Sequence, residues 1–116
     1  MKVDDAIAAH SKWKQRLKAY VDGSSKEKLS CDVVGKDDQC DLGRWLHSND
    51  AKKLGAKAAE LIPAHAEFHR CAADIVRCAD HGKKAEAESK LAMGKDFSVV
   101  SAKVVTMLSA LRAIMP

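Results

Sequence analysis

Apolar residues recur every seven positions near the C-terminal end of this chain. Two interleaved series make up the pattern: Met93, Val100, Met107 and Ile114, and Phe97, Val104 and Leu111. A heptad repeat of this kind is the seam along which helices pack in bundles and coiled coils. It predicts a long last helix over residues 84–115 that lies against other helices. The apolar stripe is broad enough to serve as a subunit interface as well, so we also expect a homodimer.

The rest of the chain is expected to be helical too. Its 116 residues include only two prolines and six glycines, the residue types that helix interiors tolerate least. Residues 3–22 carry one broad apolar face and are followed by Gly23, a residue type that commonly ends helices. Residues 51–81 form another long helical pattern, with room for a bend at Pro63 and a stop at Gly82.

A short helix is expected between these two long ones. Residues 23–39 are rich in Gly, Ser, Lys and Asp, and are predicted to be a connection with little regular structure. Asp37 and Asp38 can then cap a short helix that begins near Cys40, and Leu42 can anchor it on the bundle. The predicted fold is therefore all-α: an antiparallel four-helix bundle with an additional short helix carrying Cys40.

Length and charge narrow the range of functions. A chain of 116 residues is expected to form a single domain over residues 1–116. No apolar stretch is long enough to span a membrane, and residues 1–5 lack the apolar core of a secretion signal, so we expect a cytoplasmic protein. The net charge of +4 comes from lysines scattered among acids, whereas nucleic-acid binders concentrate positive charge on one face. Neither a membrane nor a nucleic acid is an expected partner.

Four side chains on three predicted helices are candidates for one metal site: His10, Cys40, His65 and His69. His65 and His69 are four residues apart and therefore project from one face of a helix. His10 falls in the middle of the apolar face of the first helix. Three imidazoles and one thiolate form a donor set that suits tetrahedral Zn²⁺. Cys40 lies in the first turn of its helix, where the helix dipole favours the thiolate.

The other three cysteines, Cys31, Cys71 and Cys78, are expected to remain thiols in packing or edge positions. Cys71 and Cys78 are seven residues apart on one predicted helix, so their Cα atoms should stand about 10 Å apart. That distance is too long for a disulfide between them. Both also lie more than about 100° around the helix from His65 and His69, so neither is expected to bind the metal.

These motifs resemble those of a known family. Residues 10–14 (HSKWK), 40–45 (CDLGRW) and 65–69 (HAEFH) are similar to the motifs of the chemoreceptor zinc-binding domain. This family is a small helical module found in bacterial chemoreceptors and diguanylate cyclases, and sometimes alone. The resemblance extends over residues 3–115, essentially the whole chain.

The resemblance implies a ligand set and a function. In the family, three histidines and one cysteine hold one zinc ion, and they correspond here to His10, Cys40, His65 and His69. The implied function is sensory: the domain reports zinc availability, or oxidants such as hypochlorous acid that attack the zinc-bound thiolate. The implied output is bacterial chemotaxis or cyclic-di-GMP signalling, with a chemoreceptor or a diguanylate cyclase as partner.

The residues themselves favour a regulatory or structural site over an enzyme. A zinc ion with four protein ligands leaves no position for a reacting water, and the sequence shows no Ser/His/Asp set and no phosphate loop. Two other interpretations stay open. An adaptor bundle would use zinc only to stabilise its fold. A hemerythrin-like di-iron bundle would need bridging carboxylates and more histidines, whereas His47 and His81 fall at predicted helix ends.

Overall fold

The computed structural model of the chain describes residues 3–24, 28–36, 40–92 and 96–113. All regular structure in these ranges is helical, as the sequence predicts. The helices are α1 (Val3–Asp22), α2 (Cys31–Val34), α3 (Asp41–Leu46), α4 (Asn49–Lys52), α5 (Ala56–Asp80), α6 (Lys84–Leu91) and α7 (Asp96–Arg112).

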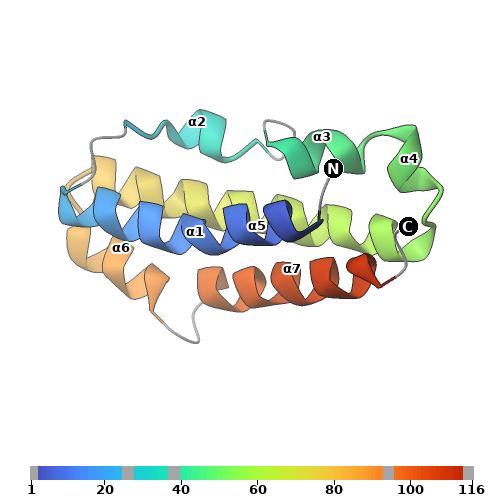
Figure 1. The fold of residues 1–116 in the computed structure, drawn as a ribbon. Helices are drawn as coiled ribbons and strands as arrows, with labels where there is room; N and C mark the ends of the chain where they lie inside the picture. The colour runs from blue at the N-terminus through green and yellow to red at the C-terminus, as the bar shows by residue number, and fades with distance from the viewer. Residues whose placement is uncertain (1–2, 25–27, 37–39, 93–95, 114–116) are drawn as a thin grey trace.

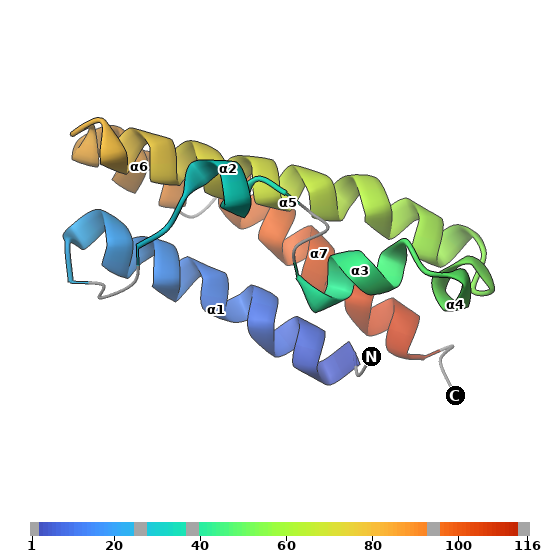
Figure 2. The same ribbon diagram turned by 90° about the horizontal axis from the view of Figure 1, so that it is seen from above.

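The helices form a four-helix bundle with antiparallel arms, which confirms the predicted fold class. Figures 1 and 2 show the path of the chain: α1 is the first arm, the short helices α2, α3 and α4 follow one another along the second, α5 is the third, and α6 and α7 make up the fourth. The helix after Cys40 is therefore one segment of the second arm. Helix α5 contacts every other helix, so its residues are close to all parts of the fold.

The core lies where α5 faces α1 and α7. Phe68 of α5 is completely buried, and its ring centroid lies 5.2 Å from that of Phe97 in α7. The heptad series of the last arm is turned inward: Phe97, Val100, Val104 and Leu111 are all buried. Met107 is only half-buried at the edge of this stripe. Burial of such side chains removes apolar area from water and is the main source of helix-bundle stability.

The last arm differs from the prediction because it is two helices rather than one over residues 84–115. Helix α6 ends at Leu91, whose carbonyl accepts a hydrogen bond of 3.3 Å from the Ser98 hydroxyl of α7. Gly94, a residue of low helix propensity, falls in the sequence between the two helices. Met93, Ile114 and Met115, which the heptad analysis included, lie outside the described residues.

Two other boundaries also differ from the prediction. The segment 23–39, predicted to have little regular structure, contains the one-turn helix α2. The long helix predicted over residues 51–81 begins at Ala56, because Gly55 adopts a φ of 70° that a helix cannot continue. Pro63 lies within α5 without interrupting it. Asp37 and Asp38, the expected capping residues of the short helix, lie outside the described residues.

The residue that caps the short helix is Cys40 itself. Its backbone is extended, and its Sγ accepts a hydrogen bond of 3.3 Å from the backbone N–H of Gly43. Helix α3 is held on the bundle by Leu42 and Leu46, which are 1% and 2% exposed.

In the described part of the chain, no helix is both long and apolar enough to cross a membrane.

Candidate metal centre

The four candidate metal ligands come together from three arms of the bundle. His10 lies in the middle of α1, Cys40 caps α3, and His65 and His69 lie one turn apart on α5. The three histidines are buried, with 2%, 0% and 3% of their surface exposed in chain order. Cys40 is only partly buried. The cluster therefore lies inside the bundle, and its sulfur is the donor nearest to solvent.

The donor atoms of the four side chains face one another. His65 Nε2 lies 3.1 Å from His10 Nε2 and 3.0 Å from His69 Nε2. Cys40 Sγ lies 3.3 Å from His65 Nε2 and 3.7 Å from His69 Nε2. All four donor atoms are within 4.8 Å of one another. The predicted residues are thus brought together, with one donor atom from each.

Two backbone carbonyls fix the orientation of the imidazoles. His10 Nδ1 lies 2.7 Å from the carbonyl oxygen of Ala6, and His69 Nδ1 lies 2.9 Å from the carbonyl oxygen of Val34. Because a carbonyl oxygen only accepts hydrogen bonds, each Nδ1 must carry the proton and donate it. Each Nε2 therefore presents a lone pair to the cluster, which is the tautomer a metal requires.

The spacing of the donors fits a zinc ion. Zinc bonds of about 2.0–2.1 Å to nitrogen and about 2.3 Å to sulfur place tetrahedral donors about 3.3–3.6 Å apart. Four of the six separations are 3.0–3.7 Å and fall around this range, and the other two are within 4.8 Å. Lone pairs crowded this closely repel one another unless a cation or a shared proton lies between them. His65 Nδ1 is buried and has no hydrogen-bond partner among the described residues, so the interactions of His65 are concentrated at Nε2.

Burial keeps the histidines neutral. Desolvation lowers the pKa of His10 below its usual 6.5, although its hydrogen bond to Ala6 partly opposes this. Desolvation and the neighbouring His69 and His10 lower the pKa of His65 to about 3. Neutral imidazole is the form that binds metals. The site is therefore ready to bind a cation at neutral pH without first losing protons from these two residues.

The thiol of Cys40 behaves differently from the sequence-based expectation. Desolvation raises the pKa of Cys40 above its usual 9, although hydrogen bonds from the backbone of Gly43 and Leu42 and the charge of Arg44 act in the opposite direction. The start of α3 therefore does not by itself make Cys40 a thiolate. A bound metal ion would supply the missing stabilisation, because a coordinated thiol is deprotonated.

Sequence reasoning missed the contribution of α2. This one-turn helix lies against α5 and brings the Val34 carbonyl to His69. Gly35 makes the close approach possible: a Cβ atom there would lie 3.2 Å from the Cys31 carbonyl oxygen and 3.3 Å from the Cβ of Ala73. A carbonyl group has no sequence signature, and Gly35 follows an otherwise ordinary segment. The one available signal was a glycine directly after two valines.

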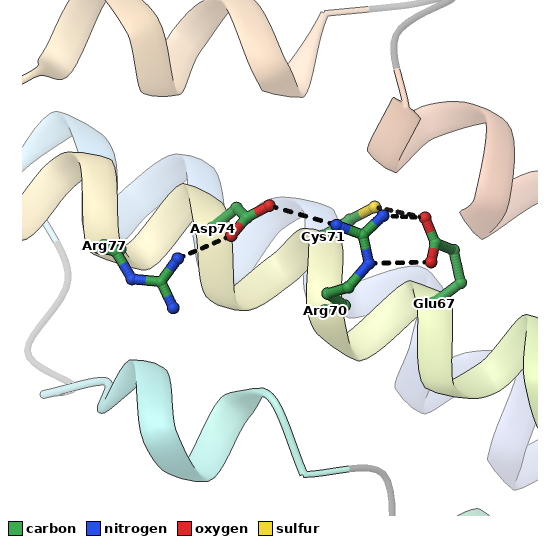
Figure 3. Close-up of polar contacts among 5 residues, drawn as sticks. All are labelled: Glu67, Arg70, Cys71, Asp74 and Arg77. Atoms are coloured by element: carbon green, nitrogen blue, oxygen red, sulfur yellow. Dashed lines mark hydrogen bonds and ion pairs between the residues drawn. The ribbon is translucent and has the colours of Figure 1, made fainter.

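Cys71 lies apart from the cluster. Its thiol donates a hydrogen bond of 3.7 Å to Glu67, within a row of ion pairs that Arg70, Asp74 and Arg77 continue along α5 (Figure 3). The hydrogen bond from Arg70 lowers the pKa of the Glu67 carboxyl. These charges are largely exposed and contribute little to stability. As predicted, Cys71 is not part of the histidine group.

The remaining histidines and cysteines are also outside the group. His47 and His81 are the residues that end α3 and α5, which confirms their predicted places at helix ends. Cys31 and Cys78 are half-buried free thiols. The group contains no carboxylate, whereas a di-iron site of the hemerythrin kind needs bridging carboxylates. In the part of the chain that the structure describes, the cluster has the composition of a mononuclear zinc site.

Comparison with known families agrees with this chemistry. No curated protein and no solved structure matches the chain. The family model for the chemoreceptor zinc-binding domain matches residues 10–76, a shorter range than the resemblance over residues 3–115. The matched range begins at His10, contains all four donor residues and covers more than half of the chain. The family that this model describes is a regulatory zinc-binding module and not a catalytic one. The chain therefore belongs to the chemoreceptor zinc-binding domain family.

Proposed function

We propose that the chain binds one zinc ion through His10, Cys40, His65 and His69. The observation that carries this proposal is the convergence of their four donor atoms within 4.8 Å of one another. Nitrogen and sulfur donors favour zinc over magnesium or calcium, which take oxygen ligands. The zinc-binding family of the chain supports the same metal.

The proposed role of this site is sensory. Four protein donors leave no coordination position for a reacting water, so a regulatory function is more consistent with the site than hydrolysis. Bound zinc would hold Cys40 as a thiolate, the form that oxidants attack. The thiolate of Cys40 and hypochlorous acid then give a sulfenic acid and a chloride ion. The alternative signal is zinc itself, through occupancy of the same four donors.

Helix α3 is the element that we expect to respond. It has six residues, and Cys40 caps it through the hydrogen bond from Gly43. Oxidation of the sulfur to a sulfenic acid would remove the negative charge of the thiolate, which makes the sulfur a poorer hydrogen-bond acceptor and weakens the link to His65 and His69. A helix this short has little stability of its own. It would then be held on the bundle mainly by Leu42 and Leu46.

The proposed output is bacterial signalling. The family name supports a chemoreceptor as the partner, with a diguanylate cyclase as the second candidate. We propose a cytoplasmic location, a single domain over residues 1–116, and a homodimer formed through α7. The dimer is supported by Val99 of α7, which is 58% exposed, and by the half-buried Met107.

Replacement of a single donor residue should disrupt the metal site. We expect wild-type protein to contain one zinc per chain, and His10→Ala, Cys40→Ser, His65→Ala or His69→Ala to weaken binding by at least about 100-fold. Loss of a group that only supports a ligand already costs about 10- to 100-fold. Elemental analysis and competition with a chromogenic chelator measure both quantities.

The matched controls are Cys31→Ser and Cys78→Ser, which alter half-buried thiols outside the group. Both variants should keep one zinc per chain with wild-type affinity. Iron in place of zinc, or loss of metal from a control, would contradict the assignment. A protein that unfolds completely when zinc is removed would favour the structural adaptor over the sensor.

The Gly35→Ala variant tests the support from α2. The added Cβ would crowd Ala73 and the Cys31 carbonyl, push α2 away from α5 and lengthen the bond between Val34 and His69. We expect zinc affinity to fall about tenfold with little loss of helix content. Val33→Ala, which shortens a side chain that is 53% exposed on the same helix, should leave affinity unchanged. Equal affinities of the two variants would show that α2 does not support the site.

Treatment with hypochlorous acid tests the oxidant sensor. With about one equivalent added to zinc-loaded protein, we expect Cys40 to be modified before Cys31, Cys71 and Cys78. Backbone amide exchange near Trp45 should rise in the same samples, because oxidation weakens the hydrogen bond that caps α3. Mass spectrometry reports both changes. Preferential reaction of another cysteine, with α3 still protected, would favour zinc as the signal.

The homodimer is tested by Met107→Lys, which places a charge at the edge of the apolar stripe of α7. We expect sedimentation to shift toward monomer while helicity is retained. Ala59→Lys adds the same charge at an exposed position of α5 and should leave the dimer intact. A wild-type protein that is monomeric at all concentrations would refute this proposal.

A further inference from the structure

A wide groove separates α1 from the arm that contains α2 and α3. Its volume is about 1250 Å³, and its lining residues come from α1, α2, α3, α5 and the segments next to α2 and α3. Figure 2 shows how α1, α2 and α3 are arranged. Trp13 belongs to the α1 side and Trp45 to the α3 side. The groove is thus bordered by an indole ring on each side.

The charged side chains that line this groove are mostly basic. Among its described lining residues these are Lys12, Arg16, Lys28, Lys36 and Arg44, against one acidic residue, Asp5. We call it the basic groove. Positive groups around a concave surface add their potentials and raise the local concentration of anions. On α5, by contrast, Arg70 and Arg77 form ion pairs with Glu67 and Asp74.

The basic groove leads to the metal centre. Three of the four candidate ligands, His10, Cys40 and His69, are among its lining residues. The two histidines are 2% and 3% exposed, whereas Cys40 is only partly buried. A molecule in the groove would therefore meet the sulfur of Cys40 before the imidazoles.

One arginine of the groove is held in place beside the cluster. The guanidinium carbon of Arg16 lies 3.9 Å from the ring centroid of Trp13, a distance at which cation and ring attract each other. The ring of Trp13 in turn packs edge-on against the imidazole of His69, with centroids 6.1 Å apart. A planar guanidinium is well suited to carboxylates and other oxyanions. Arg16 therefore adds an ordered guanidinium group to the groove that Cys40 also lines.

From these contacts we infer that the basic groove binds small anions and delivers them to Cys40. The ligand class is a small carboxylate or oxyanion that fits between Trp13 and Trp45. The basic side chains thereby determine which reagents reach the thiol: an anionic reagent is favoured over a neutral one of the same size. This selectivity extends the proposed function, and it holds whether or not Cys40 is bound to zinc.

Two alkylating reagents of matched size measure this selectivity. Iodoacetate carries a negative charge and iodoacetamide is neutral. With either one, the sulfur of Cys40 forms a bond to the methylene carbon, the carbon–iodine bond breaks, and iodide leaves. The ratio of the two rates at Cys40, measured by mass spectrometry on the 116-residue chain, cancels any difference in the fraction of thiolate. Cys78, whose side chain does not line the groove, is an internal reference.

The double variant Lys12→Gln, Lys36→Gln removes two positive charges from the rim. We expect the ratio of iodoacetate to iodoacetamide rates at Cys40 to fall about two- to fourfold at low ionic strength. The ratio at Cys78 should not change. The matched control, Lys57→Gln with Lys103→Gln, removes the same charge from exposed positions on α5 and α7 and should leave both ratios as in wild type.

Salt provides a second measurement that needs no variant. In wild-type protein, about 0.5 M sodium chloride should lower the same ratio at Cys40 by a similar factor, because it screens charges beyond a few ångströms. Circular dichroism checks that each sample keeps its helices. The inference is overturned if the ratio at Cys40 falls equally in the control variant, or if the wild-type ratio at Cys40 does not change with salt. Because the assay works on the chain with or without metal, its failure is separable from failure of the zinc assignment.

Discussion

The contact on which this structure depends is the meeting of three buried imidazoles at their Nε2 atoms. His65 lies 3.0–3.1 Å from His10 and His69, and all three side chains are buried. Buried polar rings are costly without partners, and two of them are satisfied by backbone carbonyls. Acid opposes the arrangement: the pKa of His65 is about 3 in the folded chain and near 6.5 when unfolded. Unfolding therefore takes up protons, and stability falls as the pH drops from 6.5 toward 3.

Helix faces and the members of the His/Cys cluster could be predicted from the sequence because they depend on local spacing and on residue type. His65 and His69 are four residues apart and therefore lie on a common helix face. The position of His10 among apolar residues predicts its burial. The carbonyls of Ala6 and Val34 could not be found in this way, since every residue has one. Helix α2 and the division of the last arm depend on packing that a single segment does not encode. The expected stabilisation of the Cys40 thiolate was wrong, because the sequence indicated the start of the helix but not the burial of the sulfur, which raises the pKa of the thiol.

The four donors differ in their exposure to solvent, and this difference determines which of them an oxidant can reach. The three imidazoles are almost fully buried and are resistant to mild oxidants by their nature. The sulfur is the donor that reacts with oxidants, and it is also the one nearest to solvent. The basic groove opens on that side of the cluster. Reactivity and exposure therefore coincide at Cys40, and a reagent can change one ligand while the other three remain in the core.

The same inequality explains how a local reaction could change the shape of the bundle without unfolding it. The arms α1, α5 and α7 are joined by an apolar core that includes Phe68, Phe97 and Leu111, and this core does not need the sulfur. The second arm is different: its helices have four, six and four residues and gain most of their stability from contacts with the rest of the bundle. For α3, one of those contacts is the sulfur of Cys40. A change at the sulfur would therefore act on the arm with the least stability of its own, and in the proposed sensor the long helices would be the fixed frame against which that arm moves.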